Sequence, residues 1–227
     1  MRALVVCTGV EVFPGKGTRT GIWLGELIHF FDVLTEKRIP VDITKPGGGV
    51  VPVDPKSQDS KDEIVKRYIG NEAFMDALNR VPALESIDPE PYGVVYLVGG
   101  HGAIWDLPGN EPLQKFIEAV YQANGTITAV GHGVAGLLNV RNADGSWFVK
   151  DRYLTGFSNM EEKLVSFVSE EVPFYVEDKL IEKGAHFTKT VIPFTEHIEM
   201  DERLITGQNP NSARKVAQKL IEELWEK

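Results

Sequence analysis

The segment that most clearly indicates a catalytic site is Gly131-His132-Gly133, which follows a β-branched run at residues 126–130. A small apolar segment begins at Val134, so the pattern predicts a strand, a sharp turn and the start of a helix. In α/β enzymes this geometry lifts a nucleophilic serine or cysteine above the edge of the sheet. Position 131 holds glycine, which has no side chain. The sequence therefore predicts a catalytic turn from which the nucleophilic atom is missing.

A second residue suited to acid–base chemistry is Glu26, which lies within an expected helix at residues 21–37. At 100° per residue, it falls inside the apolar arc of that helix, between Val33 and Phe30. A carboxylate in such a place must find a partner or bind a proton. The alternative is an ordinary solvated helix carboxylate. The opposite side of the helix is expected to hold Gly25, His29, Asp32 and Glu36.

A third candidate segment is the glycine-rich stretch 99–102, which contains His101 and follows an apolar run at 92–98. In a doubly wound sheet, ligands bind at the carboxyl ends of the strands, so this stretch should share a crevice with the turn described above. His101 is expected either to line that crevice or to cap a turn. The other histidines, His29, His186 and His197, lack metal-ligand spacing, so neither a catalytic metal nor another cofactor is expected.

Apolar strands and helices alternate through the first 130 residues. Strands are expected at 3–8, 41–44, 92–98 and 126–130, and helices at 21–37, at 62–79 with a break near Gly70, and at 111–124. This alternation is typical of a doubly wound α/β fold, in which helices flank a mainly parallel sheet.

The second half contains smaller elements, which we expect to be β insertions and helices of the same domain. The turn residues 142–145 and the apolar runs at 147–149 and 153–155 predict a hairpin. Ser158 and Glu161 have the spacing of a capping box at the start of a helix over 158–168. A helix at 174–183, strands at 185–188, 197–200 and 204–206, and a final helix opening at Pro210 complete the pattern. Residues 1–227 are thus expected to form one domain.

Composition and charge narrow the class of protein. Of the 227 residues, 42% are hydrophobic and 25% are charged, and the net charge is −9. An acidic chain without a Lys/Arg cluster suits neither nucleic acid nor an anionic membrane surface. No apolar run has the length of a membrane span and no signal peptide is recognised, so a cytoplasmic protein is expected. The single cysteine, Cys7, ends an apolar strand and is expected to be a buried structural thiol, not a substitute nucleophile.

Four segments of the chain, taken in order, carry a family resemblance. They are Gly99-Gly-His-Gly102 with Asp106-Leu-Pro108, Ala129-Val-Gly-His-Gly133, Thr155-Gly-Phe-Ser158, and Leu204-Ile-Thr-Gly-Gln-Asn-Pro210. Together they resemble the DJ-1/PfpI superfamily, and within it the Hsp31-type chaperone/glyoxalase group. The resemblance extends nearly from end to end. It implies a flavodoxin-like α/β fold and a homodimer.

The family pattern has a Cys–His pair at the turn, a glutamate on the first helix and an acid shortly after the Thr-Gly-Phe segment. The resemblance implies that Glu26 is the helix carboxylate and His132 the turn histidine. Glu162 matches the acid that orients the histidine, although Glu161 stands next to it. In the family, the thiolate attacks a small aldehyde or 2-oxoaldehyde such as methylglyoxal, without glutathione, and the product is a 2-hydroxy acid such as lactate.

The same resemblance places Gly100, His101 and Gly133 in the pocket, where the N–H groups of Gly100 and His101 would face a developing oxyanion. Gly131 occupies the position of the cysteine, so an inactive variant or pseudoenzyme of the glyoxalase (lyase) type is predicted. The glycine is either natural or an engineered replacement, and the residues leave both open. Alternative functions are a stress-response holdase that binds unfolded client proteins, and a cysteine-dependent amidase or peptidase, which would also need the thiol.

Overall fold

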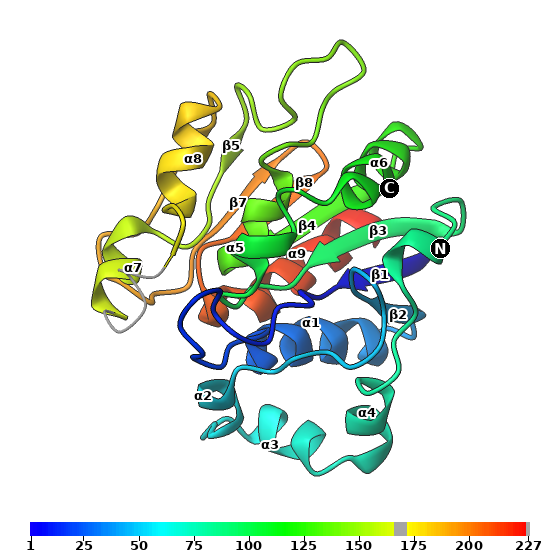
Figure 1. Cartoon of the computed structure of the whole chain (residues 1–227). Helices are drawn as coiled ribbons and strands as arrows, with labels where there is room; N and C mark the ends of the chain where they lie inside the picture. The colour runs from blue at the N-terminus through cyan, green and yellow to red at the C-terminus, as the bar shows by residue number, and fades with distance from the viewer. Residues whose placement is uncertain (166–171, 226–227) are drawn as a thin grey trace.

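A six-stranded sheet forms the centre of the computed structural model, which describes residues 1–165 and 172–225 (Figure 1). The strand order is β2-β1-β3-β4-β8-β7, and every neighbouring pair is parallel except β7 and β8. The strands are β1 (Arg2–Val6), β2 (Val41–Thr44), β3 (Tyr92–Leu97), β4 (Thr126–Val130), β7 (Ile198–Asp201) and β8 (Leu204–Gly207). The expected mainly parallel α/β sheet is confirmed.

Helices connect and cover these strands. They are α1 (Leu24–Glu36), α2 (Pro55–Gln58), α3 (Glu63–Ile69), α4 (Glu72–Ala77), α5 (Ala103–Asp106), α6 (Glu111–Gln122), α7 (Asn159–Leu164), α8 (Val176–Glu182) and α9 (Ala213–Trp225), with 3-10 turns η1 (Leu84–Ser86), η2 (Gly131–Leu137) and η3 (Pro210–Ser212). The predicted break near Gly70 is confirmed, because α3 ends one residue before it and α4 starts two residues after it. Within residues 1–165 and 172–225, no helix has both the length and the apolar character needed to span a bilayer.

The central strands are apolar because both faces of the sheet are covered. All five residues of β4 are buried, as a strand in the middle of a parallel sheet requires. On one face, Val5 and Tyr96 belong to a core with α1 and α9. On the other face, Leu4 and Leu97 belong to a second core with α5, α6 and η2. Figure 1 shows α1 and α9 lying together on one side of the sheet.

The side of α1 opposite its apolar arc is not open to solvent at Asp32. The side chain of this residue is buried, which the sequence prediction did not include. Arg67 and Tyr68 of α3 donate hydrogen bonds to Oδ1 of Asp32, and Arg214 of α9 donates one to Oδ2. At Asp32, α1 is therefore covered by α3 and α9, which provide the cations that a buried carboxylate needs, whereas Glu36 on the same side is exposed.

The predicted hairpin is wrong. Its turn forms, since Gly145 N–H donates to the Asn142 carbonyl at 2.8 Å, but the pairing beyond it is a single bridge between Arg141 and Trp147. The chain turns away at Asp151, whose φ is 61°. Downstream, β5 (Tyr153–Leu154) pairs in parallel with β6 (His186–Phe187) to form a separate small sheet. A long-range pairing has replaced the local one.

Helix α7 begins as the sequence predicts. Ser158 caps its first turn, and the reciprocal contacts between Ser158 and Glu161 form a capping box. The helix ends at Leu164, with Val165 as its C-cap residue. The expected end at residue 168 falls outside the described residues.

Candidate active site

The predicted sharp turn lies at the carboxyl end of β4. Val130 is still extended, whereas Gly131 has a φ of +56° and begins η2, a 3-10 turn in place of the expected helix start. A residue with a Cβ is strained in this region by about 1–3 kcal/mol, whereas glycine enters it freely. A Cβ added at Gly131 would lie 3.0 Å from Oε1 of Glu26. The missing side chain would therefore point at the carboxyl group of α1.

Glu26 lies in the first turn of α1 and is buried. Its Oε2 accepts a hydrogen bond of 2.7 Å from the backbone N–H of Gly99, at the end of β3. Burial raises the pKa of Glu26 to about 8, although the N–H of Gly99 opposes the shift. At neutral pH the group is therefore mainly a carboxylic acid, which is able to donate a hydrogen bond through Oε1.

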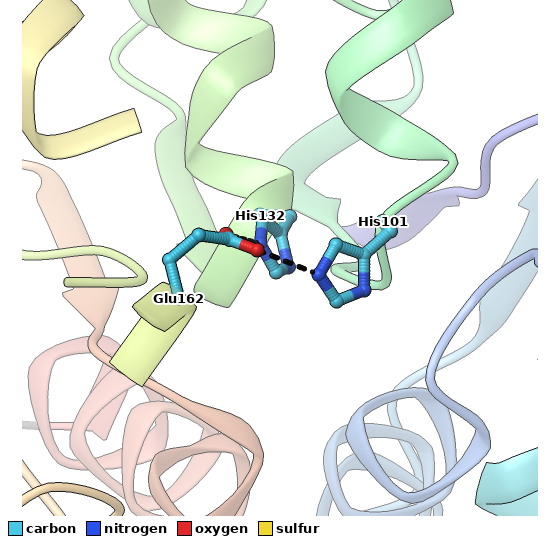
Figure 2. Close-up of side chains that lie close together, drawn as sticks. All are labelled: His101, His132 and Glu162. Atoms are coloured by element: carbon cyan, nitrogen blue, oxygen red, sulfur yellow. Dashed lines mark hydrogen bonds and ion pairs between the residues drawn. The ribbon is translucent and has the colours of Figure 1, made fainter. Parts of the chain in front are cut away.

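Glu162 of α7 is the carboxylate that faces His132. The Nε2 atom of His132 lies 2.7 Å from Oε2 of Glu162, and Nε2 of His101 lies 3.0 Å from Oε1 of the same carboxylate (Figure 2). An ionised carboxylate only accepts hydrogen bonds, so Nε2 carries the hydrogen in both rings. In a neutral His132 ring, Nδ1 is then left with a free lone pair. That nitrogen is able to accept a proton.

The protonation states of this cluster follow from burial and charge. Burial and the neighbouring His101 lower the pKa of His132 to about 4, although attraction to Glu162 opposes the shift. Burial alone would raise the pKa of Glu162, but attraction to His132 and the hydrogen bonds from both histidines hold it well below its usual range. Near neutral pH, His132 is thus a neutral base beside an ionised carboxylate.

Glu161, the adjacent acid, has a different environment. Its Oε2 accepts hydrogen bonds from the backbone and hydroxyl of Ser158, which complete the capping box. Its Oε1 accepts from the backbone of Phe194 and from the side chain of Asn209, both at 2.8 Å. Consecutive residues on a helix point in different directions, so only one of the two glutamates can face His132. Glu161 holds the chain around Phe194 and Asn209 against α7.

A cavity of about 270 Å³ opens beside these groups. Its apolar walls are Trp23, Phe157, Val165, Phe194 and Pro210, and its polar lining comes from Glu26, Gly100, His101, His132 and Asn211. The Phe157 ring lies 4.2 Å from the His132 ring, between centroids, and restricts its orientation. A cavity of this size and mixed lining suits a small polar molecule.

Of the three residues expected in the pocket, two line the cavity and one does not. His101 and Gly100 line the cavity, and Gly100 has a φ of +112°. A Cβ at Gly100 would meet the Gly21 carbonyl oxygen at 2.3 Å, so only glycine fits there. Gly133 instead faces β3, because its added Cβ would lie 2.4 Å from the Leu97 carbonyl oxygen. The structure thus assigns Gly133 to close packing between η2 and β3, and the described residues that line the cavity do not include it.

Cys7 is not among the described residues that line the cavity. It is fully buried just after β1, and burial raises the pKa of its thiol far above the usual range. A neutral, enclosed thiol is a poor nucleophile. The expectation of a buried thiol at this position is confirmed.

Several cavity residues were not predicted from the sequence. Trp23 precedes Glu26 by three residues, and residues three apart share one side of a helix. The position of Glu26 could therefore have indicated that Trp23 lines the cavity. Phe194 and Asn211 reach the cavity from a loop and a 3-10 turn far along the chain. Phe194 adopts a φ of 59°, which is uncommon for an aromatic residue and has no local signal in the sequence.

Comparison with known proteins identifies relatives along the whole chain. A family model described as "DJ-1/PfpI family" matches residues 21–223. "Glyoxalase 3" of Candida albicans is 29% identical over 222 residues, covering 93% of this chain and 92% of that protein. "Glutathione-independent glyoxalase HSP31" of Saccharomyces cerevisiae is 26% identical over 235 residues, covering 94% and 93%.

Solved structures agree with this likeness. Rapid Encystment Protein 24 KDa of Francisella tularensis superposes with a TM-score of 0.94 at 33% identity, covering 99% of both chains. Glyoxalase III of Candida albicans superposes with a TM-score of 0.86 at 27% identity, covering 98% of this chain and 96% of that one. DJ-1beta of Drosophila melanogaster, at 18% identity and a TM-score of 0.62, shares the fold.

Proposed function

The chain belongs to the DJ-1/PfpI family, and from that premise we propose that its cavity is a glyoxalase-type site for small 2-oxoaldehydes that lacks its nucleophile. One relative is named "Glyoxalase 3", and two others are named as glutathione-independent glyoxalases. The observation that carries the proposal is the direction of the vacant position, since a Cβ at Gly131 would lie 3.0 Å from Oε1 of Glu26. A cysteine there would have a carboxylic acid beside it and a histidine next in the chain.

Each group has a role in the glyoxalase reaction that the family resemblance implies. A thiolate at position 131 would form a C–S bond to the aldehyde carbon, and the resulting oxyanion would take a proton from Glu26. Nδ1 of His132 would remove the proton from that carbon and return it to the neighbouring carbon. Glu162 holds Nε2–H of His132, so Nδ1 remains the basic nitrogen. Hydrolysis of the thioester would then release the 2-hydroxy acid, for a net addition of one water.

The Gly131 protein has the acid and the base but no atom that forms the C–S bond. Loss of a covalent nucleophile lowers catalytic rates by several orders of magnitude. We therefore expect this chain to form no lactate from methylglyoxal at a rate above background. We expect it still to admit the aldehyde, because the cavity and its polar lining do not depend on a thiol.

Restoring the thiol tests the proposal. Gly131→Cys should convert methylglyoxal to lactate, whereas Gly131→Ala, which adds a Cβ without sulfur, should not. Both variants should keep the near-UV circular dichroism spectrum of the parent. A folded cysteine variant that forms no lactate would overturn the glyoxalase assignment, and assays of the same variant with amide and peptide substrates would then test the amidase alternative.

A second candidate is a holdase for unfolded proteins, which would bind apolar segments of its clients. Leu164, Val191 and Ile192 are 59%, 88% and 69% exposed, and Val191 and Ile192 are two exposed apolar residues in succession. Replacing Val191 and Ile192 together by serine should weaken suppression of client aggregation. Val50→Ser, at an apolar residue that is 62% exposed elsewhere, is the matched control. Equal suppression by all three proteins would contradict this function.

The resemblance also leads us to expect a homodimer in the cytoplasm. Sedimentation equilibrium of the purified chain tests the first expectation, and a mass close to 25.2 kDa would contradict it.

A further inference from the structure

Three ligand atoms converge beside the cavity. In the part of the chain that the structure describes, His101, His132 and Glu162 each offer one metal-ligating atom, and these atoms all lie within 4.8 Å of one another. All three residues are buried, and they come from the segment after β3, from η2 and from α7. Figure 2 shows both imidazole rings directed at the same carboxylate.

The pairing of His132 with Glu162 explains only part of this cluster. A base oriented by a carboxylate needs one histidine and one acid, as the proposed reaction uses them. His101 is a second buried histidine, and its Nε2 contacts the remaining oxygen of Glu162 at 3.0 Å. Two imidazole nitrogens and one carboxylate are the ligand set of many zinc sites in which one coordination position stays open.

We propose that His101, His132 and Glu162 form a binding site for a divalent transition metal ion of the zinc class. Its open coordination position faces the cavity, because both histidines line that space. This inference rests on the geometry of the three side chains and holds whether or not the cavity binds 2-oxoaldehydes.

The present geometry is close to what such an ion requires. The two Nε2–O contacts measure 3.0 and 2.7 Å. Zinc lies about 2.0–2.2 Å from its nitrogen and oxygen ligands, so small movements of the three side chains would admit it in place of the two shared hydrogens. The imidazole rings lie 4.1 Å apart between centroids, and the Phe157 ring packs against His132 at 4.2 Å between centroids. The ligands are therefore held near one another before an ion arrives.

Metal binding and proton transfer at His132 exclude each other. An ion bound to Nε2 requires a lone pair there, so a neutral ring must carry its hydrogen on Nδ1. Nδ1 is the nitrogen that the proposed reaction uses as its base. A bound ion should thus inhibit lactate formation by Gly131→Cys, and a chelator should restore it.

Direct metal binding is the test, with untagged chain that has been dialysed against a chelator. Titration with Zn²⁺ against a chromophoric competitor should give one equivalent per chain, and Co²⁺ should give the intense visible absorption of a four-coordinate site. His101→Gln and Glu162→Gln should each weaken Zn²⁺ binding by at least about tenfold. His186→Gln, at an exposed histidine outside the cluster, should leave binding unchanged.

The possible results distinguish failure of the metal site from failure of the proposed function. Absence of stoichiometric Zn²⁺ binding, or a weak Co²⁺ spectrum typical of six-coordinate surface sites, would overturn the proposal on the unmodified chain alone. Binding that is lost in His186→Gln and kept in the two cluster variants would also overturn it. Lactate formation by Gly131→Cys without any metal binding would leave the proposed function standing and remove only this site.

Discussion

Glu26 and Gly131 face each other across the end of the sheet, with Oε1 of Glu26 at 3.0 Å from the position of a Cβ on Gly131. The relationship depends on two elements far apart in the sequence, α1 and the turn after β4, and on the Gly99 N–H that fixes the other carboxyl oxygen. This relationship explains why the absence of a side chain at position 131 affects the proposed chemistry. The vacant space is directed at an acid that is protonated near neutral pH.

Adding a side chain at position 131 should cost stability even where it adds function. Gly131→Ala places a Cβ at a φ of +56° and against a buried carboxyl group, so we expect a loss of about 1–3 kcal/mol in the free energy of unfolding. Denaturant titration measures it. Gly109→Ala is the control, because its added Cβ meets nothing within 4 Å. Equal effects at the two positions would contradict the strain at the turn.

The raised pKa of Glu26 should make stability depend on pH. The carboxyl group has a pKa of about 8 in the folded chain against a reference value of 4.5, so the folded state retains a proton that the unfolded state releases between these values. The free energy of unfolding should then fall with rising pH, by about 1.4 kcal/mol per unit across that window. Below pH 4.5 and above pH 8 this contribution should be flat.

Glu26→Gln removes this titration while keeping an acceptor for the Gly99 N–H. The stability of the glutamine variant relative to the parent should therefore rise between pH 5 and pH 8. The exposed residue Glu90 provides the control change, Glu90→Gln. A constant difference between Glu26→Gln and the parent across this range would show that Glu26 is ionised in the folded chain.

The two neighbouring glutamates of α7 should have separable effects in the Gly131→Cys background. Glu162→Gln disturbs the contact with Nε2 of His132, so kcat for lactate formation should fall by at least about tenfold. Glu161→Gln disturbs bonds to Ser158, Phe194 and Asn209, so it should lower the free energy of unfolding by about 1–3 kcal/mol. Measuring kcat and denaturant stability for both variants tests whether Glu162 serves catalysis and Glu161 serves stability. A large loss of kcat in Glu161→Gln and a large loss of stability in Glu162→Gln would contradict these roles.

Residue patterns within short segments predicted the features that depend on neighbours in the sequence. The β-branched run before Gly131, the buried carboxylate at Glu26 and the capping box at Ser158 each follow from spacing within a few residues. The placement of Glu162 near His132 came from the family resemblance and not from periodicity. The geometry of the pair itself needed the structure, because α7 and η2 meet only through tertiary packing.

Contacts between distant segments could not be predicted from the sequence. The burial of Asp32 could not be predicted, because nothing near it in sequence shows that α3 and α9 bring Arg67 and Arg214 to that side of α1. Tyr153 and Leu154 looked like half of a hairpin because the turn before them is strong, whereas their true partners lie more than thirty residues further on. Phe194 reaches the cavity through a backbone conformation that its own type disfavours.

Lactate formation is the most direct test of the central claim, that an acid and a base surround a missing nucleophile. Methylglyoxal should be supplied, with a chelator present, to the Gly131 protein and to its Gly131→Cys and Gly131→Ser variants. We expect kcat/KM for lactate to be at least about 10³-fold higher for the cysteine variant than for the other two. Equal rates for all three proteins, with the cysteine variant folded, would contradict the account.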